Sequence, residues 1–455
     1  MTGSLRTFYI LIVTQMMSLI GSEMTALAVG IRVFKDSGSA TPLAMAAFFA
    51  AVPRLVASSF AGVLADRWDR RYVMIIADAG QAVGTLLLLI SFASGQFEVW
   101  HLYAVSLIQA AFGTFQGPAF QASVTMLVPD EQRDRANAIL QMRSPAAGLV
   151  APALAGALFA LVDATGVMVI DLLTFGAAMV VVLLVRIPRP VQTAEGRAMQ
   201  GTIWQEALVG FRFLWARRPM LVMVAAATLV NFFMSMVGVL FTPYILSLTG
   251  NETTLGMLMS ITSAGAIIGG IVMSIWGGTR PRVHTALPGI IITGLFLALF
   301  GVTRSPLAMG VALFGLMFPI PMINASFDSI LQAKTPPDLQ GRVFAAVMQV
   351  ALLASPVGYL LAGPLADGVF EPGVAGAGWD LFAPLVGSQA GSGMGLMNII
   401  AGTLIMLTAA AFYAIPAVRH MEATLPDYNP LAANGESGAE VHGPTEPAPA
   451  YERSA

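Results

Sequence analysis

The chain has 455 residues, of which 56% are hydrophobic and 11% are charged, and its formal net charge is -2. Soluble domains carry about 25% charged residues, so a single water-soluble core cannot hide this much apolar surface. The chain has no cysteine, which excludes disulfides, thiolate metal sites and cysteine catalysis. Its histidines have no ligand spacing and it has no basic tract, so we expect no metal site, no cofactor and no nucleic-acid partner.

Apolar runs of membrane-spanning length dominate the sequence. They lie at about 8–33, 43–65, 72–94, 99–127, 136–160, 165–186, 220–248, 255–277, 286–303, 307–333, 342–366 and 394–416. The first run is too long, and too closely followed by the next, to be a cleaved signal peptide. The pattern predicts an all-α integral membrane protein with twelve transmembrane helices.

Basic residues orient these spans. If the N-terminus is cytoplasmic, most arginines and lysines fall in the connections on the inner side, whereas Arg32, Lys35 and Arg304 fall on the outer side. The positive-inside rule then places both termini in the cytoplasm, as an even number of spans also requires.

The segments outside the spans divide the chain. The predicted units are a six-helix half at 1–186, a linker at 187–219, a second six-helix half at 220–416 and a tail at 417–455. In the linker, an aromatic face formed by Trp204, Leu208, Phe211 and Trp215 suits a helix that lies along the inner membrane surface. The tail has the composition of a disordered segment. The segment from Asp367 to Gly393, rich in Gly and Pro, is expected outside, as a flexible loop or a partial lid.

The two halves are related by sequence. At a constant offset, Ala155-Gly156 matches Ala362-Gly363 and Arg135 matches Arg342. A parallel repeat of this kind predicts two pseudo-symmetric halves with a substrate cavity between them. In span five, small residues from Gly148 to Gly156 predict a bend and close packing against span eight.

The connection between spans two and three concentrates charge. It reads Gly62-Val63-Leu64-Ala65-Asp66-Arg67-Trp68-Asp69-Arg70-Arg71. This segment resembles the loop between the second and third helices of the major facilitator superfamily of secondary transporters. Further motifs resemble the branch that contains macrolide-efflux proteins and the enterobactin exporter: Gly113 to Ala119, Val128 to Ala138, Ile170-Asp171 with Thr174-Phe175, Ile187 to Pro190, and Gln340 to Phe344.

This resemblance implies a cytoplasmic gate. An acid at the carboxyl end of span two is unfavourable for its own helix dipole, so the partner of Asp66 should lie elsewhere. In the resembled family this acid faces the start of span eleven, here near Gly341-Arg342, and holds the inner side shut. Gly62 would allow the close helix approach. The gate expected on these grounds consists of Gly62, Asp66, Arg67, Asp69, Arg70, Arg71 and Arg342.

Charged residues within spans each need a reason, because an ionised side chain near the bilayer centre costs a few kcal/mol. Glu23 and Arg54 lie at similar depths and are expected to pair. The pair is either a proton-coupling site, with Arg54 as counter-ion, or a permanent structural ion pair. Asp78, Arg143 and Asp328 form a second layer, either part of the cytoplasmic gate or a static Asp78–Arg143 pair. Asp171 is interpreted as structural.

Polar residues within spans are the candidates for the substrate cavity. They are accompanied by aromatic and methionine neighbours, which suits large amphipathic ligands. The candidates are Gln15, Gln109, Gln116, Asn231, Phe232, Asn324 and Tyr359.

The sequence therefore predicts a monomeric, multi-pass transporter of the bacterial plasma membrane, whose partners are a small-molecule substrate, protons and the lipid bilayer. We expect proton-driven efflux of a hydrophobic or amphipathic compound, such as a drug, a macrolide or a siderophore-like molecule. Two alternatives stay open: a proton-coupled metabolite importer and a non-transporting membrane sensor. No nucleotide-binding loop or nucleophile motif indicates an enzyme.

Overall fold

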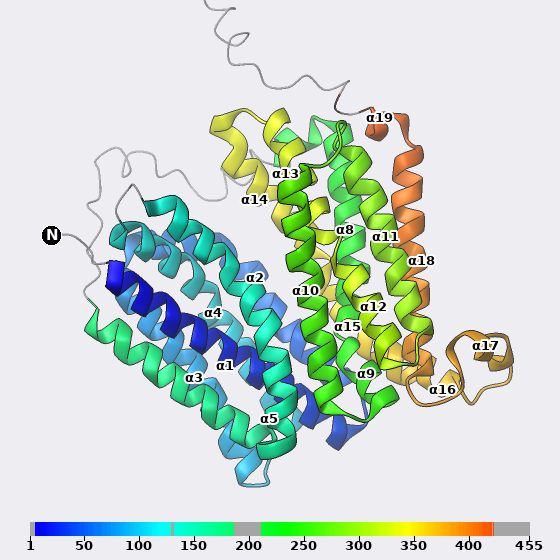
Figure 1. The fold of residues 1–455 in the computed structure, drawn as a ribbon, viewed down its shortest axis with the longest axis horizontal. Coiled ribbons are helices and arrows are strands. Elements are labelled where there is room, and N and C mark those ends of the chain that lie inside the picture. The colour runs from blue at the N-terminus through cyan, green and yellow to red at the C-terminus, as the bar shows by residue number, and fades with distance from the viewer. Residues whose placement is uncertain (1–4, 129–131, 186–210, 421, 423–455) are drawn as a thin grey trace, which may run out of the picture.

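The computed structural model describes residues 5–128, 132–185, 211–420 and 422 (Figure 1). Within these ranges, the side chains of residues 5, 57–67, 122, 125, 126, 134, 337 and 338 lie outside the described part. The described ranges are helical and contain no β-strand, which confirms the predicted all-α class.

Five helices build the first half: α1 (Leu5–Ser37), α2 (Thr41–Arg67), α3 (Arg70–Ala93), α4 (Val99–Leu127) and α5 (Arg133–Leu184). The α5 segment has 52 residues, which at 1.5 Å per residue is about 78 Å and more than twice the bilayer core. It is interrupted at Asp163, whose φ is 56°. We call the end of the bundle that holds Ser37 and Asp163 the outer end, following the predicted orientation.

Contacts at both ends show that α5 turns back at Asp163. Near the outer end of α1, Arg32 Nη1 donates to Asp163 Oδ2 at 2.6 Å. At the start of α3, Arg71 Nε donates to the backbone oxygen of Val182 at 3.0 Å, and Arg71 Nη2 donates to that of Leu183. The two legs of α5 therefore correspond to predicted spans five and six.

The second half uses shorter helices. It comprises α8 (Arg218–Gly238), α9 (Phe241–Thr249), α10 (Glu252–Trp276), α11 (Val283–Val302), α12 (Pro306–Met317), α13 (Ile320–Lys334), α14 (Pro337–Leu353), α15 (Ser355–Leu365), α18 (Ser392–Ala414) and α19 (Pro416–Arg419). Three predicted spans occur as the consecutive pairs α8–α9, α12–α13 and α14–α15. Pro319, Pro321 and Pro356 stand at two of these breaks, where a missing backbone N–H and a fixed φ interrupt a helix.

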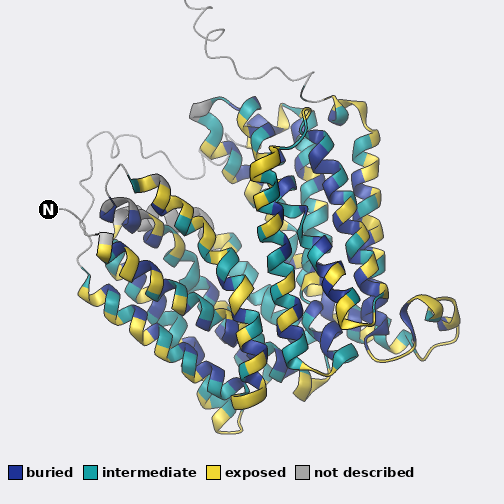
Figure 2. Ribbon diagram, in the orientation of Figure 1, coloured by how far each residue is buried: buried dark blue, intermediate teal, exposed yellow. Residues whose placement is uncertain are grey.

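The surface around the sides of the bundle is apolar. In the described part, nine helices are long and apolar enough to cross a membrane, and Thr41–Val56 is a shorter apolar helix. Ile275, Leu161 and Leu184 are 82%, 79% and 77% exposed. Exposed residues lie along the outward faces of the helices in Figure 2. Such a surface is stable in lipid, where helices satisfy their own backbone hydrogen bonds.

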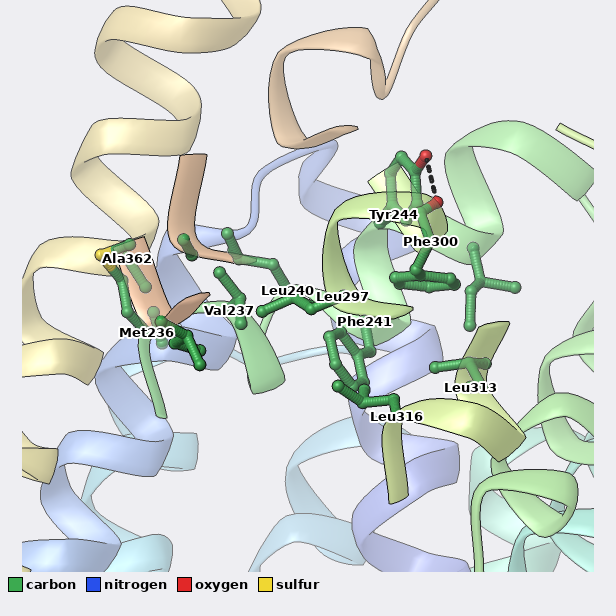
Figure 3. Close-up of a cluster of buried hydrophobic side chains, with 14 of the residues drawn as sticks. Met236, Val237, Leu240, Phe241, Tyr244, Leu297, Phe300, Leu313, Leu316 and Ala362 are labelled. Carbon is green, nitrogen blue, oxygen red and sulfur yellow. Dashed lines mark hydrogen bonds between the residues drawn. The ribbon is translucent and has the colours of Figure 1, made fainter. Parts of the chain in front are cut away.

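A packed aromatic cluster joins α9, α11 and α12 near the outer end (Figure 3). The Phe241 and Phe300 rings meet edge to face at 5.2 Å between centroids. Tyr244 is 2% exposed, and its hydroxyl donates to the backbone oxygen of Gly301 at 2.9 Å. A buried tyrosine whose hydroxyl is satisfied in this way adds apolar burial without leaving an unpaired polar group.

The two halves contact each other through glycine-rich helix faces. A Cβ at Gly156 on α5 would lie 2.4 Å from the backbone oxygen of Glu252, and one at Gly256 on α10 would lie 2.2 Å from that of Pro152. A Cβ at Gly363 on α15 would lie 2.5 Å from Thr41 Cα on α2. The predicted close packing of span five against span eight is confirmed, and α15 against α2 is its counterpart in the repeat. Towards the inner end the ribbons of the two halves diverge (Figure 1).

The outer segment before α18 is folded, so the expectation of a flexible loop is wrong. It contains η2 (Ala366–Phe370), α16 (Glu371–Gly373), η3 (Trp379–Leu381) and α17 (Ala383–Val386). Trp379 is 8% exposed, packs with Val386 and Leu396, and donates from Nε1 to the backbone oxygen of Gly387 at 2.7 Å. The α17 helix packs on α11 and α18, away from the first half (Figure 1). This position does not favour a lid between the halves.

The predicted tail begins with ordered residues. Glu422 Oε2 accepts from the backbone nitrogen of Val283 at 3.3 Å, and Glu422 Oε1 lies 3.6 Å from Arg282 Nη1. The backbone oxygen of Glu422 accepts from Lys334 Nζ at 2.8 Å. Glu422 is therefore anchored to the inner ends of α11 and α13, near the start of the segment predicted as a tail. The remainder of the tail, and residues 187–210 of the linker, lie outside the described residues. Of the predicted aromatic face, Phe211 and Trp215 are described, and both are exposed.

Candidate functional site

Asp367 fastens the two halves together at the outer end. From the end of α15 in the second half, its carboxylate reaches the start of α2 in the first half. Asp367 Oδ2 accepts from the Thr41 backbone nitrogen at 2.8 Å and from Thr41 Oγ1 at 2.6 Å. Asp367 Oδ1 accepts from the backbone nitrogen of Ala40 at 3.0 Å. Ser39 Oγ donates to Oδ2 at 2.5 Å. An anion at a helix N-terminus is stabilised by the unpaired N–H groups and by the helix dipole.

A second outer contact lies beside the α5–α10 packing. Lys35 Nζ near the end of α1 forms a salt bridge with Glu252 Oε1 at the start of α10. Deeper between the halves, the backbone nitrogen of Ala153 on α5 donates to Ser260 Oγ on α10 at 3.1 Å. Together with the Asp367 contacts, these interactions form what we call the outer closure.

Glu23, Arg54 and Tyr359 form a cluster at the junction of the halves. Glu23 is on α1, Arg54 on α2 and Tyr359 on α15 of the second half. Arg54 is close enough to interact electrostatically with both other residues. Glu23 and Arg54 are both exposed, although each lies well inside its helix. The described contacts include no direct ion pair between them, so Arg54 acts on Glu23 at longer range.

Asp78 lies in a buried amide network within the first half. It is 0% exposed. Its Oδ2 accepts from Gln15 Nε2 at 3.1 Å, and its Oδ1 accepts from Gln116 Nε2. Arg143 on α5 is within electrostatic range of Asp78 and stacks over the Phe120 ring at 4.9 Å. The structure thus brings together Asp78 and Arg143.

Asp328 lies outside that layer. It is exposed on α13 in the second half, and no charged group in the described part of the chain is in electrostatic range of its carboxyl. The depths inferred from helix rise were similar, but depth does not fix which face of a helix a side chain occupies. A static Asp78–Arg143 pair within the first half is the arrangement that this geometry favours.

Several predicted gate residues lie beyond what the structure describes. The side chains of Gly62, Asp66 and Arg67 are outside the described residues. Asp69 is the N-cap of α3, because its Oδ1 accepts from the Arg71 backbone nitrogen at 3.1 Å. Arg71 caps the end of α5, as described above, and Arg70 is half-buried at the start of α3. Arg342 is exposed on α14. The gate remains a prediction.

The candidates for the cavity separate into two groups. Gln15 is 0% exposed, and Gln109 and Gln116 also hydrogen bond within the first half, so these three belong to the buried network. The other four lie on helices of the second half: Asn231 donates to the backbone oxygen of Ala227, Phe232 packs edge to face on Phe233, Asn324 is exposed, and Tyr359 joins the Arg54 cluster. Within the described residues, no three His, Asp or Glu side chains cluster as metal ligands would.

The sequence analysis missed the residues of the outer closure. Lys35 was used only to orient the chain, and Asp367 only to mark the start of a loop. A signal was present: in each case a charged residue stands within two positions of the predicted end of an apolar span. It indicated a membrane boundary without naming the partner, which comes from the other half of the chain.

Comparisons with known proteins agree with this architecture. The family model described as Major Facilitator Superfamily matches residues 11–359. Macrolide efflux protein A of Streptococcus pyogenes is 27% identical over 365 residues, which are 79% of this chain and 89% of that protein. Multidrug efflux pump Tap of Mycolicibacterium fortuitum is 26% identical over 365 residues, covering 76% of this chain and 86% of that protein.

Solved structures show the same fold at low sequence identity. The nucleoside transporter NupG has a TM-score of 0.70 at 12% identity, covering 90% of this chain and 98% of that one. A bacterial homolog of the human lysosomal transporter Spinster, in an inward-facing and unoccupied conformation, has a TM-score of 0.68 at 16% identity, covering 93% of this chain and 98% of that one.

Proposed function

Because this chain belongs to the Major Facilitator Superfamily of transporters, we propose that it exports amphipathic small molecules by alternating access, driven by the proton gradient. The names of its relatives support export, since a macrolide efflux protein and a multidrug efflux pump each align with more than three quarters of it. The proposal includes twelve membrane passes, a monomer in the bacterial plasma membrane and cytoplasmic termini.

The observation that carries the proposal is the position of the Glu23, Arg54 and Tyr359 cluster. It joins both halves, and it lies inward of the outer closure, whereas the ribbons diverge towards the inner end. This arrangement suits the inward-facing state of an alternating-access transporter, in which a central site is open to the cytoplasm and closed to the outside.

Glu23 is the proposed coupling residue. A nearby cation stabilises the ionised form of an intramembrane carboxyl, whereas desolvation stabilises its neutral form. Its protonation state therefore changes when the side of the membrane from which water reaches it changes. Arg54 supplies the cation, and its proximity to Tyr359 makes that influence depend on the second half. Rocking of the halves would therefore change the environment of Glu23 without moving α1 relative to α2.

The substrate class follows from the walls of the junction. Phe232, Phe233 and Met234 on α8 are half-buried and offer flexible and polarizable surface, and the charged cluster offers one polar anchor. Such a wall accepts amphipathic ligands of varied shape. Macrolides are the first compounds to test.

The test is export from intact cells. A bacterial host without its own drug pumps is given the gene, and its susceptibility to erythromycin, ethidium, lipophilic cations and catecholate siderophores is compared with that of the empty host. The proposal predicts higher resistance and lower accumulation of at least one compound, both abolished by a protonophore. Resistance that survives collapse of the proton gradient would contradict proton coupling. Greater accumulation in expressing cells would instead indicate an importer.

A further inference from the structure

Asp171 is a buried carboxyl that has no charged partner among the described residues. It lies on the second leg of α5, against the middle of α1, and is 1% exposed. Gly21 makes room for it, because a Cβ there would lie 2.9 Å from Asp171 Oδ1. The hydroxyls around the carboxyl are neutral: Thr85 Oγ1 is 3.1 Å from Oδ2, Ser22 Oγ is 3.3 Å from Oδ1, and the Thr25 hydroxyl also lies beside it.

The helices that pack around Asp171 carry charged groups that interact with other residues. On α1, Glu23 faces Arg54, and Arg32 pairs with Asp36 and Asp163. On α3 and the first leg of α5, Asp78 and Arg143 interact with each other. On α4 the titratable groups are His101, which accepts from the backbone nitrogen of Glu98 at the outer end, and Tyr103, which stacks on Phe49. An ionised carboxylate buried without a counter-ion costs several kcal/mol, so the neutral acid is the stable form at this position.

The hydrogen bonds of Ser22 also indicate that Asp171 is neutral. The single hydroxyl hydrogen of Ser22 has two acceptors within reach, the backbone oxygen of Ser18 at 3.1 Å and Asp171 Oδ1 at 3.3 Å. With a proton on Asp171 Oδ1, the acid donates to Ser22 while Ser22 donates to Ser18. Both contacts are then satisfied, which an ionised Asp171 does not allow.

A series of hydrogen bonds, made by side chains and the backbone oxygen of Gln81, links Asp171 to Asp78. Thr85 accepts from Gln109 Nε2 at 3.1 Å, which leaves its hydroxyl hydrogen for Asp171 Oδ2. Gln109 Nε2 also donates to the backbone oxygen of Gln81, whose side chain donates to Gln116. Gln116 and Gln15 in turn donate to Asp78. Asp78 thus receives two amide donors beside an arginine, as an ionised carboxylate requires, whereas Asp171 has hydroxyls alone. Two carboxyls in such unlike surroundings take different protonation states.

We propose that Asp171 is a second proton-binding site of the transport cycle, occupied in the conformation described here. The inference rests on the proposed proton-driven export. In the cycle, Oδ1 of Asp171 takes a proton originating outside, holds it in the inward-facing state and releases it to water on the inner side when substrate binds. Ser22 is half-buried on α1, so it is the partner through which the proton leaves the buried carboxyl. Asp171 is therefore more than a structural residue.

The direct test is infrared spectroscopy of the purified full-length protein in detergent at neutral pH. The carbonyl stretch of a protonated carboxyl is compared in the wild type, Asp171→Asn and the matched variant Asp78→Asn. We expect the band in the wild type and in Asp78→Asn, and its loss in Asp171→Asn. A band that Asp171→Asn retains in full would overturn the proposal. If Asp171→Asn does not fold, Thr85→Val and Ser22→Ala decide, since each removes one hydrogen bond and should shift the band. A band that moves in neither variant also overturns the proposal.

A transport measurement separates this site from a purely structural role. In proteoliposomes, Asp171→Asn should still exchange erythromycin across the membrane, but its export driven by a pH gradient should fall at least 10-fold. Gradient-driven export at the wild-type rate would contradict the proposal. If the wild-type protein exports no probe, the proposed function fails, whereas the infrared band still reports whether Asp171 holds a proton.

Discussion

Asp367 Oδ2 accepts a hydrogen bond from the Thr41 backbone nitrogen at 2.8 Å, so an acid of the second half caps a helix of the first half. Loss of an N-cap costs about 0.5–2 kcal/mol. That interaction exists only while the outer end is closed. Its free energy therefore favours the closed outer end.

The Asp367→Ala variant should shift the conformational equilibrium towards outer opening by about 1 kcal/mol, or roughly fivefold. Since the chain has no cysteine, spin labels can be placed at Leu161→Cys and Leu307→Cys, two exposed sites at the outer ends of the two halves. The distance distribution between the labels should gain a longer component in Asp367→Ala. Asp380→Ala, an exposed acid on the same outer segment, is the control. Equal distributions in both variants would show that the cap does not govern closure.

Linking Lys35 and Glu252 covalently should arrest transport. Both side chains belong to the outer closure, and they come from different halves. The double variant Lys35→Cys/Glu252→Cys should export normally when reduced and lose most of its export after mild oxidation, because the outer end can no longer open. Each single variant, oxidised in the same way, is the control. Full export by the cross-linked protein would exclude rocking at this position.

A methyl group at Gly363 should force the outer ends apart. A Cβ there would lie 2.5 Å from Thr41 Cα, and neither backbone can yield without separating α15 from α2. Overpacking of this kind costs about 1–3 kcal/mol. Gly363→Ala should therefore reduce export about 10-fold at unchanged expression. Gly368→Ala, where nothing lies within 4 Å, should export as the wild type does.

The Glu23→Gln variant should uncouple export from pH. In the wild type, export from proteoliposomes should rise as the pH falls on the side that receives the substrate, because protons then enter through the coupling site. Glutamine cannot titrate, so the variant should transport at a rate independent of the gradient while still exchanging erythromycin. A Glu23→Gln protein with the pH profile of the wild type would assign coupling to another carboxyl, with Asp171 the next candidate.

Replacement of Trp379 should loosen the outer segment. The residue supplies most of a small core with Val386 and Leu396, and Trp→Ala changes in cores cost about 3–5 kcal/mol. We expect Trp379→Ala to make the segment between Phe370 and Ser392 sensitive to protease in detergent. Leu381→Ala, at a residue that is 76% exposed, should leave it resistant. Equal resistance in both variants would mean that Glu371, which binds the start of α18, is sufficient to hold the segment.

The fold was predictable because its signals are local or periodic. Apolar runs set the positions of the helices, and the repeat at Gly156 and Gly363 marked the two places where the halves contact each other. The break at Asp163 also fell between predicted spans five and six. The outer segment was mispredicted because its composition, rich in Gly and Pro, hides one tryptophan with a compact set of neighbours.

The candidate site was only partly predictable. Arg54 lies near Glu23 as expected, because depth along a helix follows from residue number. The rotation of a side chain around its helix does not, and this is why Gln15 and Gln116 bind Asp78 instead of facing substrate. The role of Asp367 depends on a contact between residues more than 300 positions apart, for which a single sequence holds no signal.

The docking of Glu422 onto Arg282, Val283 and Lys334 has a practical use for measuring motion. The described contacts of Glu422 are all with the second half, so residue 422 moves with that half. A fluorophore at the nearby exposed Ala417, paired with one on the inner end of α3, would report each rocking movement as a change in energy transfer, while Glu422 keeps its contacts.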